Sequence, residues 1–421
     1  MKIAGASSPE AEDGATASSS PSRRQSVEII AGNDDVLMEI LLRCPVKSLV
    51  RFKCVSSHWH SLISGSQFSL LHTLCNLNCN FSGLLLRKRP YFHPTSDGSD
   101  FEFVALDGGL SGVPPLRSLD FVHPSRSSGS GIKILQSCNG LLLCCSYPYT
   151  IGTIRNYYVV NPTTKQYVVV DPPQSGSSTT TFGISLAFDP SKSPRYKMVL
   201  VRSTPQSIYS YQIEIYTAES HSWRICSDCF TKPFDMLFTD GVFWNGAIHW
   251  ISPSGASSRF DVDSECVKPM PAAPVVRRDW RPRRYRYFGE SNDHLHLIEV
   301  YGSQTREFQV FELKRDYSEW LVKYSVNLDG CVAAFPEMVR NCPDSCDEIS
   351  YAFSILGVLR GSNEDDSFLV LNVPGMLVSY KFKDGSLKKL LNFGPGKINK
   401  SHVLQFGCYD SYQFFVTLAP V

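Results

Sequence analysis

Residues 241–251 read GVFWNGAIHWI, and this stretch decides the fold class of most of the chain. The pair Asn245-Gly246 stands between two short runs of aromatic and β-branched residues. Asn-Gly suits a two-residue turn because both positions tolerate a positive φ, and the flanking residues favour strands. The stretch therefore predicts a β-hairpin.

Similar units follow one another along the chain. Each can be marked by the strand residue that enters its turn, namely Val160, Tyr216, Phe260, Phe311 and Tyr380. The intervals between these marks run from 44 to 69 residues, and a weaker unit ends near residues 104–107. Repeats of about 40–50 residues are typical of four-stranded propeller blades, so residues 80–421 predict roughly six blades. A β-sandwich or another all-β array is the alternative.

Composition agrees with a strand-rich protein and narrows its class. The chain has 421 residues, 43% of them apolar, and 41 Lys+Arg against 40 Asp+Glu give a net charge of +1. This balance excludes the broad basic surface of a non-specific nucleic-acid binder. The first residues lack the apolar core of a secretory signal, and residues 1–30 predict a disordered tail. The expected location is the cytoplasm, the nucleus or both, with no membrane partner.

Residues 31–75 have a different pattern, that of a small helical domain. Asn33 can cap a first helix, whose apolar stripe contains Ile40 and Leu41. Pro45 suits the start of a second helix, and a third carries Trp59 before the stop at residues 64–66. Three short helices bury too little apolar surface to be stable alone. They are expected to dock on a partner or, alternatively, on the chain's own β-domain.

Residues 34–72, DDVLMEILLRCPVKSLVRFKCVSSHWHSLISGSQFSLLH, resemble the plant-type F-box. The resemblance implies docking to the Skp adaptor of a Skp–cullin–F-box ubiquitin ligase. Carried over by position, the adaptor-binding residues are Ile40, Leu41, Pro45, Val46, Leu49, Val50, Val55 and Trp59. Two departures from the family pattern are expected to weaken docking without abolishing it. Residues 31–33 replace the usual Leu-Pro, and Cys44 replaces a leucine.

The β region resembles the F-box-associated region, which is similar to kelch-type propellers. The motifs that carry the resemblance are SCNGLLLC at 137–144, VNPTT at 160–164, AFDP at 187–190 with YK at 196–197, and GAIHW at 246–250. The paired glycines of true kelch repeats are absent, so the domain is kelch-like and no closer. The predicted fold is α+β and multidomain: a small all-α, three-helix F-box at 31–75, then an all-β propeller at 80–421.

One segment of unusual charge is a candidate for target binding. Residues 275–287 hold six arginines and one aspartate among aromatic residues. Arginine and aromatic side chains are enriched at interface hot spots, and guanidinium groups suit acidic or phosphorylated motifs. The candidate target-binding residues are Trp280, Arg281, Arg283, Arg284, Tyr285 and Arg286. The alternatives are a solvated loop, and a nuclear-import or nucleic-acid contact.

Signals for catalysis or metal binding are weak. His294 and His296 could share a strand face and ligate a metal, but two residues of one face need no such role. The cysteine pairs 226/229 and 342/346 lie too far apart in sequence for an ordinary zinc site. Nucleophile elbows and phosphate-binding glycine loops are absent. The prediction is a non-catalytic chain without cofactor or metal.

Together these features predict a substrate receptor of a ubiquitin ligase. The F-box would bind a Skp-type adaptor and through it a cullin, while the β-domain would hold an unknown target protein near the ubiquitin-loaded enzyme. One rival is a stand-alone propeller scaffold whose helices pack only on the chain itself. A more remote rival is a propeller enzyme that acts on carbohydrate.

Overall fold

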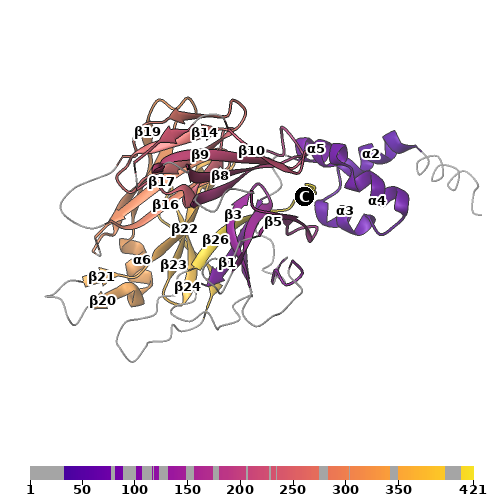
Figure 1. Ribbon diagram of the computed structural model, residues 1–421. Helices are drawn as coiled ribbons and strands as arrows, with labels where there is room; N and C mark the ends of the chain where they lie inside the picture. The colour runs from indigo at the N-terminus through magenta and orange to yellow at the C-terminus, as the bar shows by residue number, and fades with distance from the viewer. Residues whose placement is uncertain are drawn as a thin grey trace, which may run out of the picture.

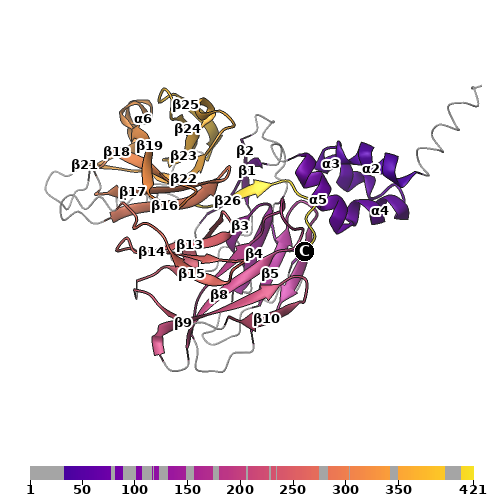
Figure 2. The ribbon, with the colours of Figure 1, turned by 90° about the horizontal axis from the view of Figure 1, so that it is seen from above.

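The computed structural model describes residues 33–76, 81–88, 101–106, 116, 118–122, 131–147, 156–173, 180–204, 207–226, 229–233, 235–274, 283–302, 304–341, 349–393 and 409–421. The tail predicted for residues 1–30 lies outside these ranges. Figures 1 and 2 show a lobe of helices beside a larger lobe of sheets, with the end of the chain between them.

The helical lobe, called the helical module below, contains the three expected helices and, in its described part, a fourth that was not expected. They are α2 (Asp34–Leu42), α3 (Val46–Phe52), α4 (Ser57–Ser64) and α5 (Ser66–Cys75). As predicted, the Asn33 side chain caps α2, accepting bonds from the backbone N–H groups of Asp35 and Val36. Gly65 ends α4 and at once begins α5. The expected stop is therefore a corner between two helices.

Helix α5 locks the turn between α2 and α3. Nε2 of His72 lies 2.9 Å from the carbonyl oxygen of Cys44, and Asn76 Nδ2 donates to the carbonyl of Leu42 at 3.0 Å. The second bond satisfies a carbonyl that the end of α2 leaves without a helical partner, and the first satisfies a carbonyl of the turn itself. The shared core of the module consists of Leu37, Leu41, Val46, Leu49, Ile63 and Phe68, joined by Leu418 from the other end of the chain.

The sheet lobe is a six-bladed β-propeller, as the repeat spacing predicted. The five blades of four strands are β3 (Gly131–Cys138), β4 (Leu141–Tyr147), β5 (Tyr157–Asn161) and β6 (Gln166–Val170); β7 (Thr181–Ala187), β8 (Lys197–Thr204), β9 (Ser207–Thr217) and β10 (Ser222–Ile225), with β11 (Phe230–Thr231) on β9; β12 (Val242–Trp244), β13 (Ala247–Ile251), β14 (Ser257–Asp261) and β15 (Cys266–Pro269); β16 (Arg283–Ser291), β17 (His294–Tyr301), β18 (Glu307–Leu313) and β19 (Trp320–Asn327); and β22 (Ser354–Leu359), β23 (Phe368–Val373), β24 (Met376–Lys381) and β25 (Leu387–Asn392).

The sixth blade closes the ring with strands from both ends of the domain. It pairs β26 (Tyr409–Phe415) with β1 (Phe81–Lys88), and β1 with β2 (Glu102–Ala105). The inner strands β26, β3, β7, β12, β16 and β22 contact one another in sequence around the axis. An insertion before β22 holds α6 (Asp329–Ala334), η2 (Pro336–Met338), β20 (Val339–Asn341) and β21 (Ile349–Tyr351); the remaining short turns are η1 (Phe238–Asp240) and η3 (Glu364–Asp366).

Each of the six interfaces between neighbouring blades encloses one apolar cluster. In β1, for example, Leu84 and Leu86 face the blade of β22, while Leu85 faces the blade of β3. Strands covered on both faces need apolar residues at successive positions, which explains runs such as Leu84 to Leu86.

The hairpins predicted from the sequence are confirmed. Asn245 (φ 47°) and Gly246 (φ 74°) form the turn between β12 and β13. The five residues that marked the repeat all lie in the third strand of their blades, namely β5, β9, β14, β18 and β24. The spacing therefore reported the blades themselves.

The helical module joins the propeller at the end of the ring that carries the tight turns. In each antiparallel blade, the first-to-second and third-to-fourth connections lie at this end. Phe415, where β26 ends, pairs with Phe81, where β1 begins. The start of β1 and the end of β26 therefore lie at the same end, from which residues 416–421 continue to the helical module, as Figures 1 and 2 show.

Candidate functional site

Three apolar side chains that the helical module exposes, called the exposed strip below, do not belong to its own core. Val36 and Ile40 lie one turn apart on α2 and are 40% and 47% exposed, and Val55, after α3, is 61% exposed. Isolated exposed apolar side chains are ordinary, but a group of them on so small a domain indicates a partner surface.

The eight predicted adaptor-binding residues divide into two groups. Leu41, Val46 and Leu49 are buried, and their side chains pack the helices of the module together. Ile40, Pro45 and Val55 are exposed, whereas Val50 and Trp59 are partly buried against the core. The exposed and partly buried residues are available to a partner. The three buried residues lie beneath them and hold the helices together.

The departures from the family pattern have a partial structural explanation. Cys44 Sγ lies 3.5 Å from the carbonyl oxygen of Ile40, and the side chain is partly buried against the module core. It thus fills the position of the usual leucine with a smaller apolar group. Residues 31 and 32, which stand where the family usually has Leu-Pro, lie outside the described ranges.

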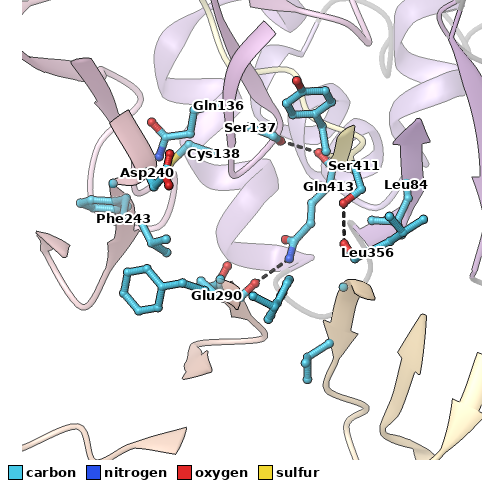
Figure 3. Close-up of a pocket in the computed structure, with 18 of the residues that line it drawn as sticks. Leu84, Gln136, Ser137, Cys138, Asp240, Phe243, Glu290, Leu356, Ser411 and Gln413 are labelled. Atoms are coloured by element: carbon cyan, nitrogen blue, oxygen red, sulfur yellow. Dashed lines mark hydrogen bonds between the residues drawn. The ribbon is translucent and has the colours of Figure 1, made fainter. Parts of the chain in front are cut away.

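The propeller axis holds a cavity of about 260 Å³ lined by the inner strands (Figure 3). Its polar side chains are used to join blades. Ser137 on β3 donates to the carbonyl of Gln413 on β26 at 2.5 Å, and Ser411 donates to the carbonyl of Leu356 on β22. Gln413 Nε2 crosses the axis to the carbonyl of Glu290 on β16 at 2.5 Å. These bonds close the ring, so we assign them a structural role.

Glu290 is the cavity's titratable group of greatest interest. Burial raises its carboxyl pKa to about 7, against an opposing effect of His294. Its Oε1 accepts the backbone N–H of Asp293 at 2.8 Å. The carboxyl pKa is higher in the folded state than in the unfolded state. The stability that it contributes is therefore fully present below about pH 4.5 and is lost as the pH rises through 7.

We expect Glu290→Gln to become more stable relative to the parent chain as the pH rises from 5 to 8. The glutamine keeps an acceptor for Asp293 but removes the charge. The gain in the free energy of unfolding should be about 2 kcal/mol, less than the full pKa shift would give, because water in the cavity partly solvates the carboxylate. Chemical unfolding at several pH values measures it. A difference that stays flat with pH would show that Glu290 ionises normally.

The structure describes only part of the predicted target-binding segment. Trp280 and Arg281 lie outside the described residues, and for Arg283, Arg284 and Tyr285 only the backbone, at the start of β16, is described. As the first strand of its blade, β16 begins at the end of the ring opposite the helical module, so the backbone of residues 283–285 lies there.

The side chain of Arg286 is largely buried. It is 12% exposed, Nε donates to Glu299 Oε1 at 2.7 Å, and Nη1 donates to the carbonyl of Ser252 at 2.9 Å. The residue therefore joins two blades, which corrects the expectation that it faces a target. The sequence held a signal for this: counting outward from the turn Asn292-Asp293 places Arg286 opposite Glu299.

The predicted absence of a metal site rested on the histidine and cysteine patterns. His294 Nδ1 lies 2.9 Å from Glu312 Oε1, and His296 Nε2 lies 3.5 Å from Oε2. Burial opposes ionisation of Glu312, but the hydrogen bond from His294 and the nearby His296 hold its pKa below the usual range. Burial lowers the pKa of His296. No group of three or more potential ligands suited to a metal occurs in the described ranges. Cys342 and Cys346 lie outside them.

Two parts of the site were missed in the sequence. Helix α5 buries Ser69, His72 and Thr73 beside Phe68, so its inner face is too polar to read as an apolar stripe. Residues 416–421 follow β26, and Leu418 enters the module core. The alternation in FVTLAPV at 415–421 was the available signal, but it does not tell where such a segment packs.

Among the described helices, none is long and apolar enough to cross a membrane.

Comparison with known proteins agrees with this division. Residues 33–71 match the F-box domain, and residues 117–281 match the F-box associated beta propeller domain. The F-box protein At5g07610 of Arabidopsis thaliana is 34% identical over 415 residues, which cover 94% of each chain. The F-box protein At5g49610 of the same plant is 33% identical over 312 residues, covering 70% of this chain and 79% of the relative. With an F-box on four helices and a closed six-bladed propeller behind it, the chain belongs to the family of plant F-box proteins with an F-box-associated β-propeller, proteins of the substrate-receptor type.

Proposed function

We propose that the chain is the substrate-recognition subunit of a Skp–cullin–F-box E3 ubiquitin ligase. In this proposal residues 31–75 bind the Skp-type adaptor and through it the cullin, and residues 80–421 bind a target protein. The observation that carries it is the exposed strip of Val36, Ile40 and Val55 on a module whose own core is already filled. A filled core leaves this strip without an internal role.

The proposed adaptor contacts follow from exposure. Ile40, Pro45 and Val55 would touch the adaptor directly, with Val50 and Trp59 at the margin. Leu41, Val46 and Leu49 would hold the helices in place beneath them. This assignment separates residues whose substitution weakens binding from residues whose substitution unfolds the module.

The proposed mechanism is proximity. The chain needs no catalytic residue, cofactor or metal of its own, because tethering a target beside the ubiquitin-loaded enzyme raises its effective concentration there. The proposal places the protein in the cytoplasm, the nucleus or both, and expects no nucleic acid among its partners.

For the target surface we retain Trp280, Arg281, Arg283, Arg284 and Tyr285; the last three begin β16, at the end of the ring opposite the helical module. The double variant Arg283→Glu, Arg284→Glu tests this assignment once a target has been captured. Unchanged capture would remove the segment from the target surface.

A stand-alone scaffold is the second candidate. The observation in its favour is that the module packs on the chain's own C-terminal residues through Leu418. In that case the helices would serve the propeller and bind no adaptor.

Reconstitution separates the two candidates. Purified chain, Skp-type adaptor, cullin, RING subunit and charged ubiquitin-conjugating enzyme are combined, and ubiquitin transfer to the chain's own lysines is followed. Transfer that depends on the adaptor supports the receptor. An adaptor that neither binds the chain nor promotes transfer supports the scaffold.

A further inference from the structure

Residues 416–421, called the strap below, lie between the helical module and the blade of β3 to β6. Leu418 packs toward the module and is only 7% exposed within its core, and Val416 packs against both this core and the cluster between the blades of β1 and β3. Ala419 and Val421 pack toward the interface between the blades of β3 and β7. One extended segment thus belongs to two cores at once. Figure 1 shows the end of the chain lying between the two lobes.

Asn161 clamps the strap to the propeller. The side chain is fully buried, and its Nδ2 donates to the carbonyls of Thr417 and Ala419 at 3.2 and 2.8 Å. Its Oδ1 accepts the backbone N–H groups of Thr163 and Thr164 at 2.9 and 3.2 Å. The amide therefore holds its own turn with one atom and the strap with the other.

The neighbouring turn is shaped to receive the strap. Gly140 has φ +95°, and a Cβ there would lie 2.6 Å from Cγ2 of Thr417. Beside it, Asn139 Nδ2 donates to the carbonyl of Phe188 at 2.7 Å. The motifs at 137–144, 160–164 and 187–190, singled out in the sequence without a role, therefore meet where the strap passes.

We propose that the strap fixes the orientation of the helical module on the propeller, and that Leu418 and Asn161 are positioning residues for ubiquitin transfer. This inference rests on the proposed ligase function. Domains joined by a small contact move relative to one another by default, and such motion would spread a bound target over many distances from the ubiquitin-loaded enzyme. A segment buried in both cores removes that freedom.

The test compares variants that release the strap with variants that only weaken a core. Asn161→Asp keeps the acceptor for Thr163 and Thr164 but loses the donor to the strap. Leu418→Ala withdraws the strap from the module, and Leu418→Met is the conservative rescue. Ile63→Ala is the matched control, since Ile63 is fully buried in the same core but does not belong to the strap.

Spin labels at Cys75 on α5 and at a cysteine replacing Lys192 report the distance between module and propeller in the full chain, with other accessible cysteines changed to serine. We expect one narrow distance distribution in the parent chain, in Leu418→Met and in Ile63→Ala. In Asn161→Asp and Leu418→Ala it should broaden about twofold. Unchanged width in both strap variants, or equal broadening in Ile63→Ala, overturns the proposal.

The functional readout is the pattern of ubiquitin on the chain's own lysines in the reconstituted ligase. The parent chain should be modified at a small fixed set, and Asn161→Asp should spread ubiquitin over more lysines while it binds the adaptor within about twofold of the parent affinity. An unchanged pattern in Asn161→Asp would contradict the positioning role. The distances are also measured without adaptor, so a failure of the chain to bind adaptor refutes the ligase proposal separately.

Discussion

Ile40→Asp should weaken binding of a purified Skp-type adaptor by more than about a hundredfold while leaving the fold intact. Ile40 is 47% exposed on α2, where a partner must bury it, and an aspartate would be desolvated there without a counter-charge. Because the side chain is outside the module core, the thermal unfolding midpoint should stay close to that of the parent chain. Titration calorimetry measures the affinity.

The matched control is Val322→Asp. Val322 on β19 is 51% exposed, similar to Ile40, and lies in the propeller rather than on the module. It should bind adaptor like the parent chain. Equal weakening in both variants, or none in Ile40→Asp, would contradict the assignment of the exposed strip. Deleting residues 34–72 is a poorer test because it strips the cover from Leu418.

Arg286→Met should destabilise the propeller by about 3–5 kcal/mol, the usual cost of removing one partner of a buried ion pair. The Glu299 side chain is 1% exposed and would lose its guanidinium partner, while the hydroxyl of Tyr301 still donates to it. The carbonyl of Ser252 in the adjacent blade would also lose the Arg286 donor and keep the backbone N–H of Gly255, at 3.0 Å. Urea unfolding measures the change.

Two further variants make the Arg286 result specific. Arg286→Met with Glu299→Leu removes both charges and should be more stable than the single variant. Arg315→Met breaks an ion pair with Asp293 whose side chains are 64% and 56% exposed, and it should cost less than about 1 kcal/mol. If Arg286→Met leaves stability unchanged but abolishes capture of a target, Arg286 belongs to the binding surface after all.

Local features of this protein were predictable because their physical causes are local. Asn245-Gly246 needs only its own backbone preferences to specify a hairpin, and Asn33 needs only the next three residues to cap α2. The repeat of hairpins then gave the blades. The predicted adaptor-binding residues mixed exposed and buried positions. Ile40 and Leu41, for example, are neighbours on one helix but occupy different faces, and the family pattern alone does not separate them.

The missed features depend on residues distant in sequence. Leu418 completes a core that begins at Leu37, and Asn161 binds a segment more than 250 residues away. Arg286 is an exception: its partner Glu299 lies in the same hairpin, and counting outward from Asn292-Asp293 pairs the two, whereas the arginine-rich composition alone made Arg286 look free. Helix α5 was not predicted because its buried face includes the polar residues His72 and Thr73, which form hydrogen bonds there and interrupt the apolar pattern.

The most direct measurement is the mass of the complex formed when the full chain and a Skp-type adaptor are co-expressed and passed through size-exclusion chromatography with light scattering. The receptor proposal predicts one peak with the mass of one chain and one adaptor, and separate peaks for Ile40→Asp. Separate elution of the parent chain and the adaptor at micromolar concentration would contradict it.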